Sequence, residues 1–245
     1  MNQNRFITLP RLYIVSADFS AEQNIELSSD THHYLRNVMR KEVGDHLRVF
    51  NGHDGEWLAE ISKLDKKAAE ICLKQKIREQ TKAIDLSLFI SPIKKERLEW
   101  LVEKISEIGL KKICLVKMDR STNTNVNIER LQAIAISSAE QSERLNIIEI
   151  EENDNLKSLE GFGALSHRVC ACLERASVPR ILQAQHSLKK ADHLSVLIGP
   201  EGGFSPEEQN FLLSSRNVIP VSLGETILRS ETAAIVAAAQ VMAVL

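Results

Sequence analysis

The sequence predicts an α/β protein in two parts: a small β domain over residues 1–78 and a larger domain with a parallel sheet over residues 79–245. Short strand-like runs separated by turn signals fill the first part. From residue 84, strand and helix patterns alternate, which is typical of a parallel sheet covered by helices. Near the C-terminus, two glycine-containing loops each follow an apolar strand and lead into a helix, an arrangement typical of ligand sites.

The first part shows strand-like runs and one helix pattern. The turn sequence Val43-Gly44-Asp45 and the run at 51–55 separate strands and favour a small β-barrel. A helix is predicted over residues 30–40, where Arg36 and Arg40 form a basic edge at spacing i,i+4. Such an edge either faces solvent or contacts phosphates. The strands are predicted at 11–15, 25–27, 46–50, 56–61 and 69–73, and the apolar face of the helix holds Leu35, Val38 and Met39.

Polar residues at 74–83 mark the boundary between the parts. In the helix predicted over residues 94–108, apolar residues recur at helical spacing and Gly109 follows as a C-cap. Basic residues crowd its first turn, where the helix dipole favours anions. Either a bound phosphate or the neighbouring acidic side chains and solvent offset this conflict. The other predicted helices span 128–144, 178–189 and 231–245, and the strands span 84–90, 112–116, 168–173, 194–198 and 218–221.

The last predicted helix, residues 231–245, is apolar on nearly every side, with Gln240 as its polar interruption. A helix of this kind is buried on several sides, and this one is too short to span a membrane. It therefore lies either at the centre of its domain or at a subunit interface, and we expect a homodimer.

Two loops are the candidate ligand site. The first, residues 199–205, ends in a capping box formed by Ser205 and Glu208, which begins a helix. The second, residues 222–229, precedes a helix for which Ser230 is the candidate N-cap. Their glycines either permit tight turns or let a ligand lie against bare backbone. If the two preceding strands are adjacent, both loops face one crevice.

Composition and missing motifs narrow the class of ligand. The net charge of −2, with 43% hydrophobic and 26% charged residues, is ordinary for a globular protein, and the basic excess lies in the first half. The P-loop, dinucleotide-binding and hydrolase-elbow motifs do not occur in the sequence. A ligand held mainly by backbone, without phosphate-binding groups, is neutral or cationic, and S-adenosylmethionine fits that description.

The sequence also indicates where the protein is located and whether it binds a metal. The sequence shows neither a signal-peptide pattern nor an apolar run long enough to cross a membrane, so we expect a cytoplasmic protein. Its seven histidines lack metal-ligand spacing, and we expect no metal. The cysteines fall in strand-like runs and are expected to be reduced core thiols: Cys72, Cys114, Cys170 and Cys172.

A set of short motifs occurs in order along the whole chain, at residues 33–40, 44–45, 94–109, 120–121, 139–144, 198–204, 223–224 and 227–233. Together they resemble the RsmE family of SPOUT-class methyltransferases. The resemblance implies an N-terminal PUA-like RNA-binding β-barrel, a C-terminal SPOUT-type parallel sheet with a trefoil knot, and a homodimer with the cofactor site near its interface. Glu225-Thr226 departs from the family pattern, in which Pro-Arg is common at these two positions.

The resemblance also implies an activity: methylation by S-adenosylmethionine of N3 of one uridine in 16S rRNA, uridine 1498, on the assembled 30S subunit. Arg229 is the candidate for stabilising charge on the uracil oxygens, and Glu231 or Glu201 is the candidate general base. Cofactor contacts are expected from Leu197, Gly199, Pro200, Gly202, Gly203, Leu223, Gly224, Ile227, Leu228, Arg229, Ser230 and Ala233. RNA phosphate contacts are expected from Arg11, Arg36, Arg40, Lys94, Arg97, Arg120 and Arg144.

Two other functions fit parts of the pattern. A non-catalytic RNA-binding factor for ribosome assembly would keep the cofactor loops but not transfer a methyl group. A small-molecule methyltransferase would have no need of a separate β domain with paired arginines.

Overall fold

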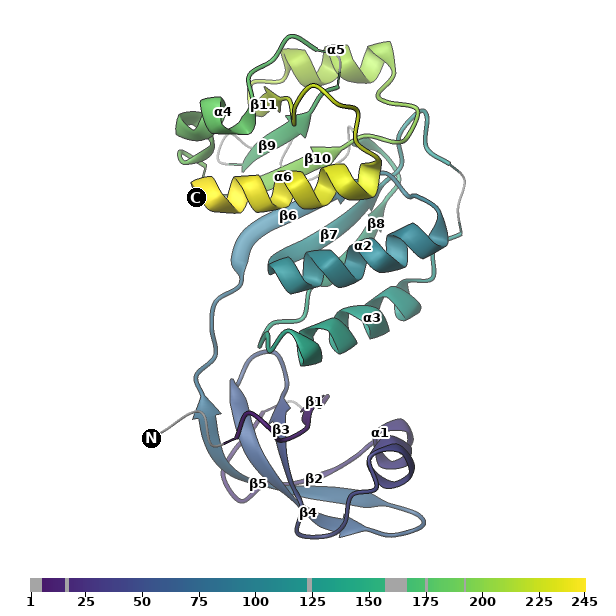
Figure 1. The fold of residues 1–245 in the computed structure, drawn as a ribbon, viewed down its shortest axis with the longest axis vertical. Helices are drawn as coiled ribbons and strands as arrows, with labels where there is room; N and C mark the ends of the chain where they lie inside the picture. The colour runs from purple at the N-terminus through teal and green to yellow at the C-terminus, as the bar shows by residue number, and fades with distance from the viewer. Residues whose placement is uncertain (1–5, 16–17, 123–124, 157–166, 175, 192) are drawn as a thin grey trace. The chain divides into compact units, whose positions relative to one another are not determined.

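The computed structural model describes residues 6–15, 18–122, 125–156, 167–174, 176–191 and 193–245 (Figure 1). Contacts divide the chain into two compact units, Met1–Lys82 with Ala139–Asn146, and Ala83–Ser138 with Ile147–Leu245. The segment Ala139–Asn146 therefore belongs to the first unit, an assignment that the sequence patterns did not indicate.

The first unit is built on a mixed five-stranded sheet with the order β1-β3-β4-β5-β2. Strand β1 runs parallel to β3, and the other neighbours pair antiparallel. The predicted N-terminal β domain is thus confirmed. Strand β5 extends to Arg78, beyond the predicted end at residue 73, because these residues pair with β4. The strands are β1 (Arg11–Tyr13), β2 (Asn24–Glu26), β3 (His46–Phe50), β4 (Glu56–Leu64) and β5 (Ala69–Arg78).

The segment predicted as one helix, residues 30–40, forms a short α-helix followed by a π-helical turn. Helix α1 (Ser29–His33) begins at the N-cap Ser28 and passes into a π-helical turn, η2 (Tyr34–Val38). A π turn has a wider period than an α-helix, so the predicted apolar face breaks: Leu35 is buried, but Val38 is exposed. Arg40 lies beyond the helix in the left-handed region, with φ of 53°. Arg36 and Arg40 are therefore not an i,i+4 pair on one helix.

The second unit contains the predicted parallel sheet, with six strands in the order β11-β9-β10-β6-β7-β8, all parallel. Strand β9 separates β10 from β11, so the two strands that precede the glycine-containing loops are not adjacent, contrary to expectation. The sequence reading also missed β8, an acidic edge strand with little apolar periodicity. The strands are β6 (Ile84–Ile90), β7 (Leu110–Val116), β8 (Glu149–Asn153), β9 (His167–Cys172), β10 (His193–Ile198) and β11 (Val218–Val221). The trefoil knot stays a prediction.

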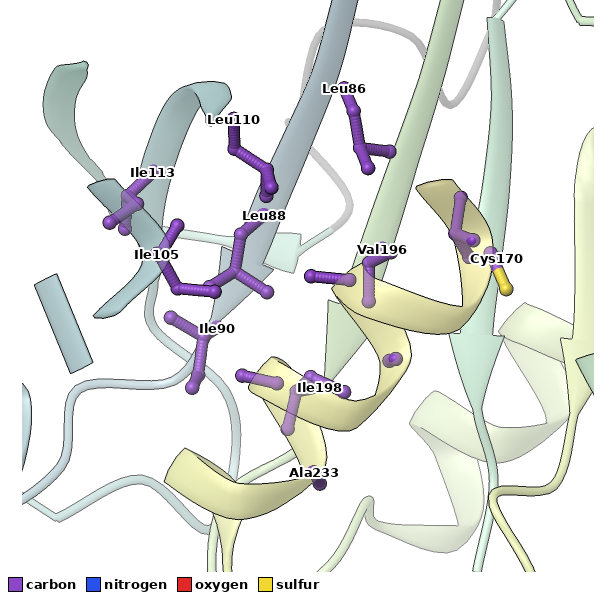
Figure 2. Close-up of a cluster of buried hydrophobic side chains, with 14 of the residues drawn as sticks. Leu86, Leu88, Ile90, Ile105, Leu110, Ile113, Cys170, Val196, Ile198 and Ala233 are labelled. Atoms are coloured by element: carbon purple, nitrogen blue, oxygen red, sulfur yellow. The ribbon is translucent and has the colours of Figure 1, made fainter. Parts of the chain in front are cut away.

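Apolar residues cover both faces of this sheet. On one face, β6, β10 and β9 pack against α2, α4 and α6 in the largest cluster of buried side chains (Figure 2). On the other, α5 packs over Phe89, Val169 and Leu197. Gly109 ends α2 with φ of 109°, as predicted. The helices are α2 (Lys95–Ile108), α3 (Ile128–Gln141), α4 (Ile181–Leu188), α5 (Pro206–Ser214) and α6 (Ser230–Val244).

Helix α6 is apolar on most sides because it is the central helix of its layer. It packs between α2 and α4 and lies against β10 and β6. Its buried residues include Ala234, Ala237, Ala238 and Val241, and these small side chains allow the helix to approach the sheet closely. The central location, one of the two explanations offered by the sequence, is therefore confirmed.

The four cysteines are free and buried, as predicted. Burial, with the nearby carboxylate of Glu151, raises the pKa of the Cys114 thiol to about 12, so this thiol is a poor nucleophile at neutral pH. Among the described residues, every helix is too short or too polar to cross a membrane.

Candidate active site

The loop at 199–205 leaves the carboxyl end of β10 and is fastened to the segment that follows β7. The Ser205 hydroxyl donates to Asp119 Oδ2 at 2.5 Å, and the Asp119 amide donates to Glu208 Oε1 at 2.9 Å. The other oxygen of Glu208 accepts from the Ser205 amide at 2.8 Å, completing the predicted capping box of α5. Asp119 is a positioning residue that sequence reasoning missed, since nothing in its local pattern distinguishes it.

Within this loop, contacts inside the protein account for the glycines. Gly203 has φ of 69°, and its amide donates to the Pro200 carbonyl at 2.8 Å to close a turn. A Cβ at Gly199 would lie 2.9 Å from the ring of Phe204, so a larger residue at that position would require the ring to shift. Arg120 Nη1 donates to the Gly202 carbonyl at 2.9 Å. Arg120, predicted to contact RNA, therefore holds the loop with one of its nitrogens.

The second loop, at 222–229, leaves the carboxyl end of β11 and is tied to the first. The Ser230 hydroxyl donates to the Gly199 carbonyl at 3.2 Å, which joins the loops although β9 separates their strands. Ser230 is thus not the N-cap of α6, because Arg229 occupies that position without a side-chain cap. Glu225 lies 3.6 Å from the guanidinium of Arg180, a neighbour that the sequence could not indicate because it lies 45 positions earlier in the chain.

The three candidate catalytic residues differ in their surroundings. Glu231, in the first turn of α6, is 7% exposed, and its Oε1 lies 3.6 Å from Arg97 Nε. Its other oxygen, Oε2, is buried and has no hydrogen-bond partner within the part of the chain that the structure describes. A buried carboxylate oxygen without a donor is costly, which makes this atom unusual in the second unit. Arg229 and Glu201 are both exposed.

The predicted cofactor residues gather at the carboxyl edge of the sheet, but their side chains are not equally free. Leu197 is fully buried in a cluster with Phe89 and Phe204, so its side chain is not exposed to a ligand. Pro200 and Ala233 are also buried. Leu223 and Leu228 are half-buried against the core, and Ile227 is 59% exposed. Gly202 is exposed, and Gly224 is half-buried with φ of 143°.

The structure corrects the predicted RNA contact at Arg11 and places Arg144 in a half-buried position. Arg11 is 8% exposed and forms an ion pair with the fully buried Glu56, so its guanidinium is not available to a phosphate. It also donates to the carbonyls of Ala139 and Arg144 at 2.6 and 2.5 Å. Burial lowers the pKa of the Arg144 guanidinium, which is half-buried. The sequence predicts an RNA contact for each of these two arginines, because no local pattern around either one indicates burial.

The other predicted RNA contacts are more accessible. Arg40 and Lys94 are exposed, and Arg36 is half-buried. Lys94 is the N-cap residue of α2 and makes no side-chain cap, so the first amides of that helix are not capped by it. Arg97 is turned to Glu231 instead.

One group of possible metal ligands occurs among the described residues. Atoms of Asp18, His53 and Asp54 lie within 4.8 Å of one another at the surface. The Asp54 carboxylate already accepts from the Phe19 amide at 2.8 Å and from Asn51 Nδ2 at 2.7 Å. These bonds explain the loop geometry without an ion.

Comparisons with known proteins agree with this arrangement. The profile of a family described as the RNA methyltransferase domain matches residues 80–242, and that of the RNA methyltransferase PUA domain matches residues 27–72. The ribosomal RNA small subunit methyltransferase E of Rickettsia conorii is 37% identical over 94% of this chain and 94% of its own length. The protein of the same name from Synechocystis is 27% identical over 100% of this chain and 80% of its own length.

Two solved structures are similar over nearly the whole chain. A probable rRNA-methyltransferase from Porphyromonas gingivalis has a TM-score of 0.82 and 28% identity, with 96% of this chain and 98% of that one covered. A putative methyltransferase from Legionella pneumophila, solved with bound SAM, has a TM-score of 0.80 and 26% identity, with 97% and 98% covered.

Proposed function

Because the chain belongs to the RNA methyltransferase family of ribosomal RNA small subunit methyltransferase E, we propose that it methylates N3 of uridine 1498 in 16S rRNA, using S-adenosylmethionine, on the assembled 30S subunit. The observation that carries this proposal is the buried, unpartnered Oε2 of Glu231 beside two joined loops at the carboxyl edge of the sheet. Such a site suits a reaction in which a proton leaves before a group is transferred. Since ribosomal subunits are its substrate, we place the protein in the cytoplasm.

The residues present fit S-adenosylmethionine. When bound, this cofactor supplies an electrophilic methyl group on a sulfonium. The backbone of Gly199, Gly202 and Gly224 offers amides and carbonyls to the adenosine, and the half-buried Leu223 and Leu228 offer apolar contact. No P-loop is needed, because the ligand carries no phosphate.

In the proposed mechanism the protein's own residues move the proton and balance the charge. The N3 proton of uracil passes to a carboxylate, and we assign Glu231 to this role rather than Glu201, because Glu231 is shielded from water. Negative charge then develops on the uracil oxygens. The exposed guanidinium of Arg229 is placed at the start of α6, where it can donate to one of them.

Replacing Arg229 with alanine is expected to lower turnover about 100- to 1,000-fold, the usual effect of removing one donor to a developing oxyanion. Cofactor affinity should stay within a fewfold of that of the wild type, since the loop backbone does not depend on this side chain. Single-turnover rates and equilibrium titration with S-adenosylmethionine measure the two effects separately. Equal losses in rate and cofactor affinity would mean that Arg229 only shapes the loop.

RNA binding is proposed for Arg36, Arg40 and Lys94, with Lys94 at the uncapped start of α2 as the contact most favourably placed for a phosphate. Replacing Lys94 with glutamine should reduce by about 1 the slope of log K against log salt for subunit binding. The matched control is Lys104→Gln on the same helix, because Lys104 is already paired with Glu103 and Glu107. If Lys94→Gln and Lys104→Gln give the same salt slope, Lys94 does not contact an RNA phosphate.

A homodimer is proposed from the outward face of α6, where Thr232, Ala239 and Ala243 are exposed and small. Ala239→Glu is expected to convert a dimer to a monomer in sedimentation velocity, because a charge would be buried without a partner. Gln209→Glu, on the exposed side of α5, is the control and should leave the dimer intact. A wild-type protein that sediments as a monomer would contradict the proposal.

The function is tested by incubating the protein with labelled S-adenosylmethionine and 30S subunits from a strain that lacks this gene. We expect label in the 16S rRNA of these subunits and none in subunits from the parent strain, whose site is already methylated. Cofactor binding without transfer would favour the alternative, a ribosome-assembly factor. Absence of cofactor binding would contradict the assignment of the two loops.

A further inference from the structure

We propose that Arg97 is a positioning residue for the proton transfer: it holds one oxygen of the Glu231 carboxylate and thereby leaves the other for the substrate. This inference rests on the proposed function and adds to it a residue on another helix. It also replaces the expectation that Arg97 binds an RNA phosphate.

The geometry brings together the first turns of two helices that pack against each other. Arg97 lies in the first turn of α2 and Glu231 in the first turn of α6, and the two helices are in contact. Arg97 Nε lies 3.6 Å from Glu231 Oε1, with side chains that are 33% and 10% exposed. The printed ion-pair contact of Arg97 is thus to Oε1, whereas Oε2 has no hydrogen-bond partner among the described residues.

The pair also resolves an electrostatic conflict. A cation in the first turn of α2 is disfavoured by the helix dipole, and Arg97 is offset by a carboxylate that the dipole of α6 favours. Lys94 and Lys95, in contrast, are exposed and are free to meet an anion from solvent. The sequence left two ways to offset these three cations, a bound phosphate or acidic side chains and solvent, and the structure gives Arg97 a carboxylate partner on another helix.

The unpartnered oxygen indicates what the site is built to receive. Leaving a buried carboxylate oxygen without a donor is unfavourable, so a donor brought by a ligand would remove a cost that the free protein carries. The imide N3–H of uracil is such a donor. In the proposed step the N3–H bond breaks, an O–H bond forms at Glu231 Oε2, and the electron pair stays on the uracil ring, while Arg97 fixes the direction of the carboxylate.

A double-mutant cycle tests this role in catalysis. Single-turnover rates with saturating S-adenosylmethionine are measured for Arg97→Gln, Glu231→Gln, the double variant and Arg97→Lys. We expect Arg97→Gln to be slower by about 10- to 100-fold, as for a misplaced catalytic group. The double variant should be no slower than Glu231→Gln, and Arg97→Lys should keep most of the rate because it keeps the charge. Losses that multiply in the double variant would overturn the proposal.

Two readouts do not depend on activity. In the protein without cofactor, Arg97→Gln should lower the thermal unfolding midpoint, and adding Glu231→Gln should restore it, because the uncompensated carboxylate is then removed. The salt slope of subunit binding should be unchanged in Arg97→Gln; a reduction of about 1 would assign Arg97 to a phosphate and overturn the inference. Arg130→Gln is the control, since Arg130 pairs with Glu99 at the surface of the same unit.

The outcomes separate this inference from the proposed function. If the wild type transfers no methyl group, the proposed function fails, whatever the stability cycle gives. If the wild type is active and Arg97→Gln matches it in rate, only the role of Arg97 fails.

Discussion

Replacing Glu56 with glutamine is expected to destabilise the first unit by about 3 to 5 kcal/mol, the usual cost of removing one partner from a buried ion pair. Glu56 is fully buried and pairs with Arg11, while Arg78 Nη1 and Arg48 Nη1 lie 3.5 and 3.9 Å from its Oε2. Burial lowers the pKa of the Arg11 guanidinium and the Glu56 carboxylate opposes that shift. Without this carboxylate, the positive charges would repel one another in a dry environment.

The two tryptophans allow the effect to be assigned to one unit. Trp57 lies in β4 and Trp100 in α2, so denaturant unfolding followed by fluorescence in a Trp100→Phe background reports on the first unit alone. Glu79→Gln is the matched control, because Glu79 forms an exposed pair with Lys76, and it should change stability by less than about 0.5 kcal/mol. If the Glu56 and Glu79 variants are equally stable, the backbone carbonyls alone are sufficient partners for the arginines around Glu56.

Replacing Glu231 with glutamine is expected to lower methyl transfer by about 100- to 10,000-fold, the contribution of a positioned general base. Cofactor affinity should stay within a fewfold. Stability should change little, because the substitution removes both a buried carboxylate oxygen and the ion pair with the partly exposed Arg97, and these two effects oppose each other. Loss of activity without loss of stability distinguishes a catalytic residue from a structural one.

Glu201, the other candidate for the general base, provides a comparison for this prediction. Glu201 is exposed on the first loop, and Glu201→Gln should keep the rate within a fewfold of that of the wild type. Glu207→Gln, in the exposed first turn of α5, controls for the loss of one negative charge near the loops. A large loss in Glu201→Gln with a normal rate in Glu231→Gln would exchange their roles.

Much of the fold could be predicted because local signals agreed with it. The capping box at Ser205 and Glu208 and the C-cap at Gly109 mark helix ends through local geometry, and both are confirmed. Strands β6 and β10 are mostly apolar and end in buried apolar runs, which is the expected pattern for a parallel sheet covered on both faces. Strand alternation with helices then predicted the parallel sheet itself.

The misses come from contacts that join distant parts of the chain. Strand β9 lies between β10 and β11 because a crossover, rather than sequence order, sets sheet neighbours. The sequence predicts an RNA contact for Arg11 because the partner that buries it, Glu56, is 45 residues away. Arg97 lies near Glu231, which is on another helix, and no local pattern indicates this pair. The predicted strand ends at residue 73, short of the end of β5, because the pairing of these polar residues with β4 has no local signature.

The central claim is that this protein methylates uracil N3 of one 16S rRNA uridine, and mapping the methyl group tests it most directly. After reaction with 30S subunits from a strain lacking the gene, the 16S rRNA is read by reverse transcription and its nucleosides are identified by mass spectrometry. We predict a single new stop, at uridine 1498, and the appearance of N3-methyluridine, because a methyl at N3 blocks base pairing. A methylated product without a stop, or a methyl group on a ribose or on another base, would contradict the account.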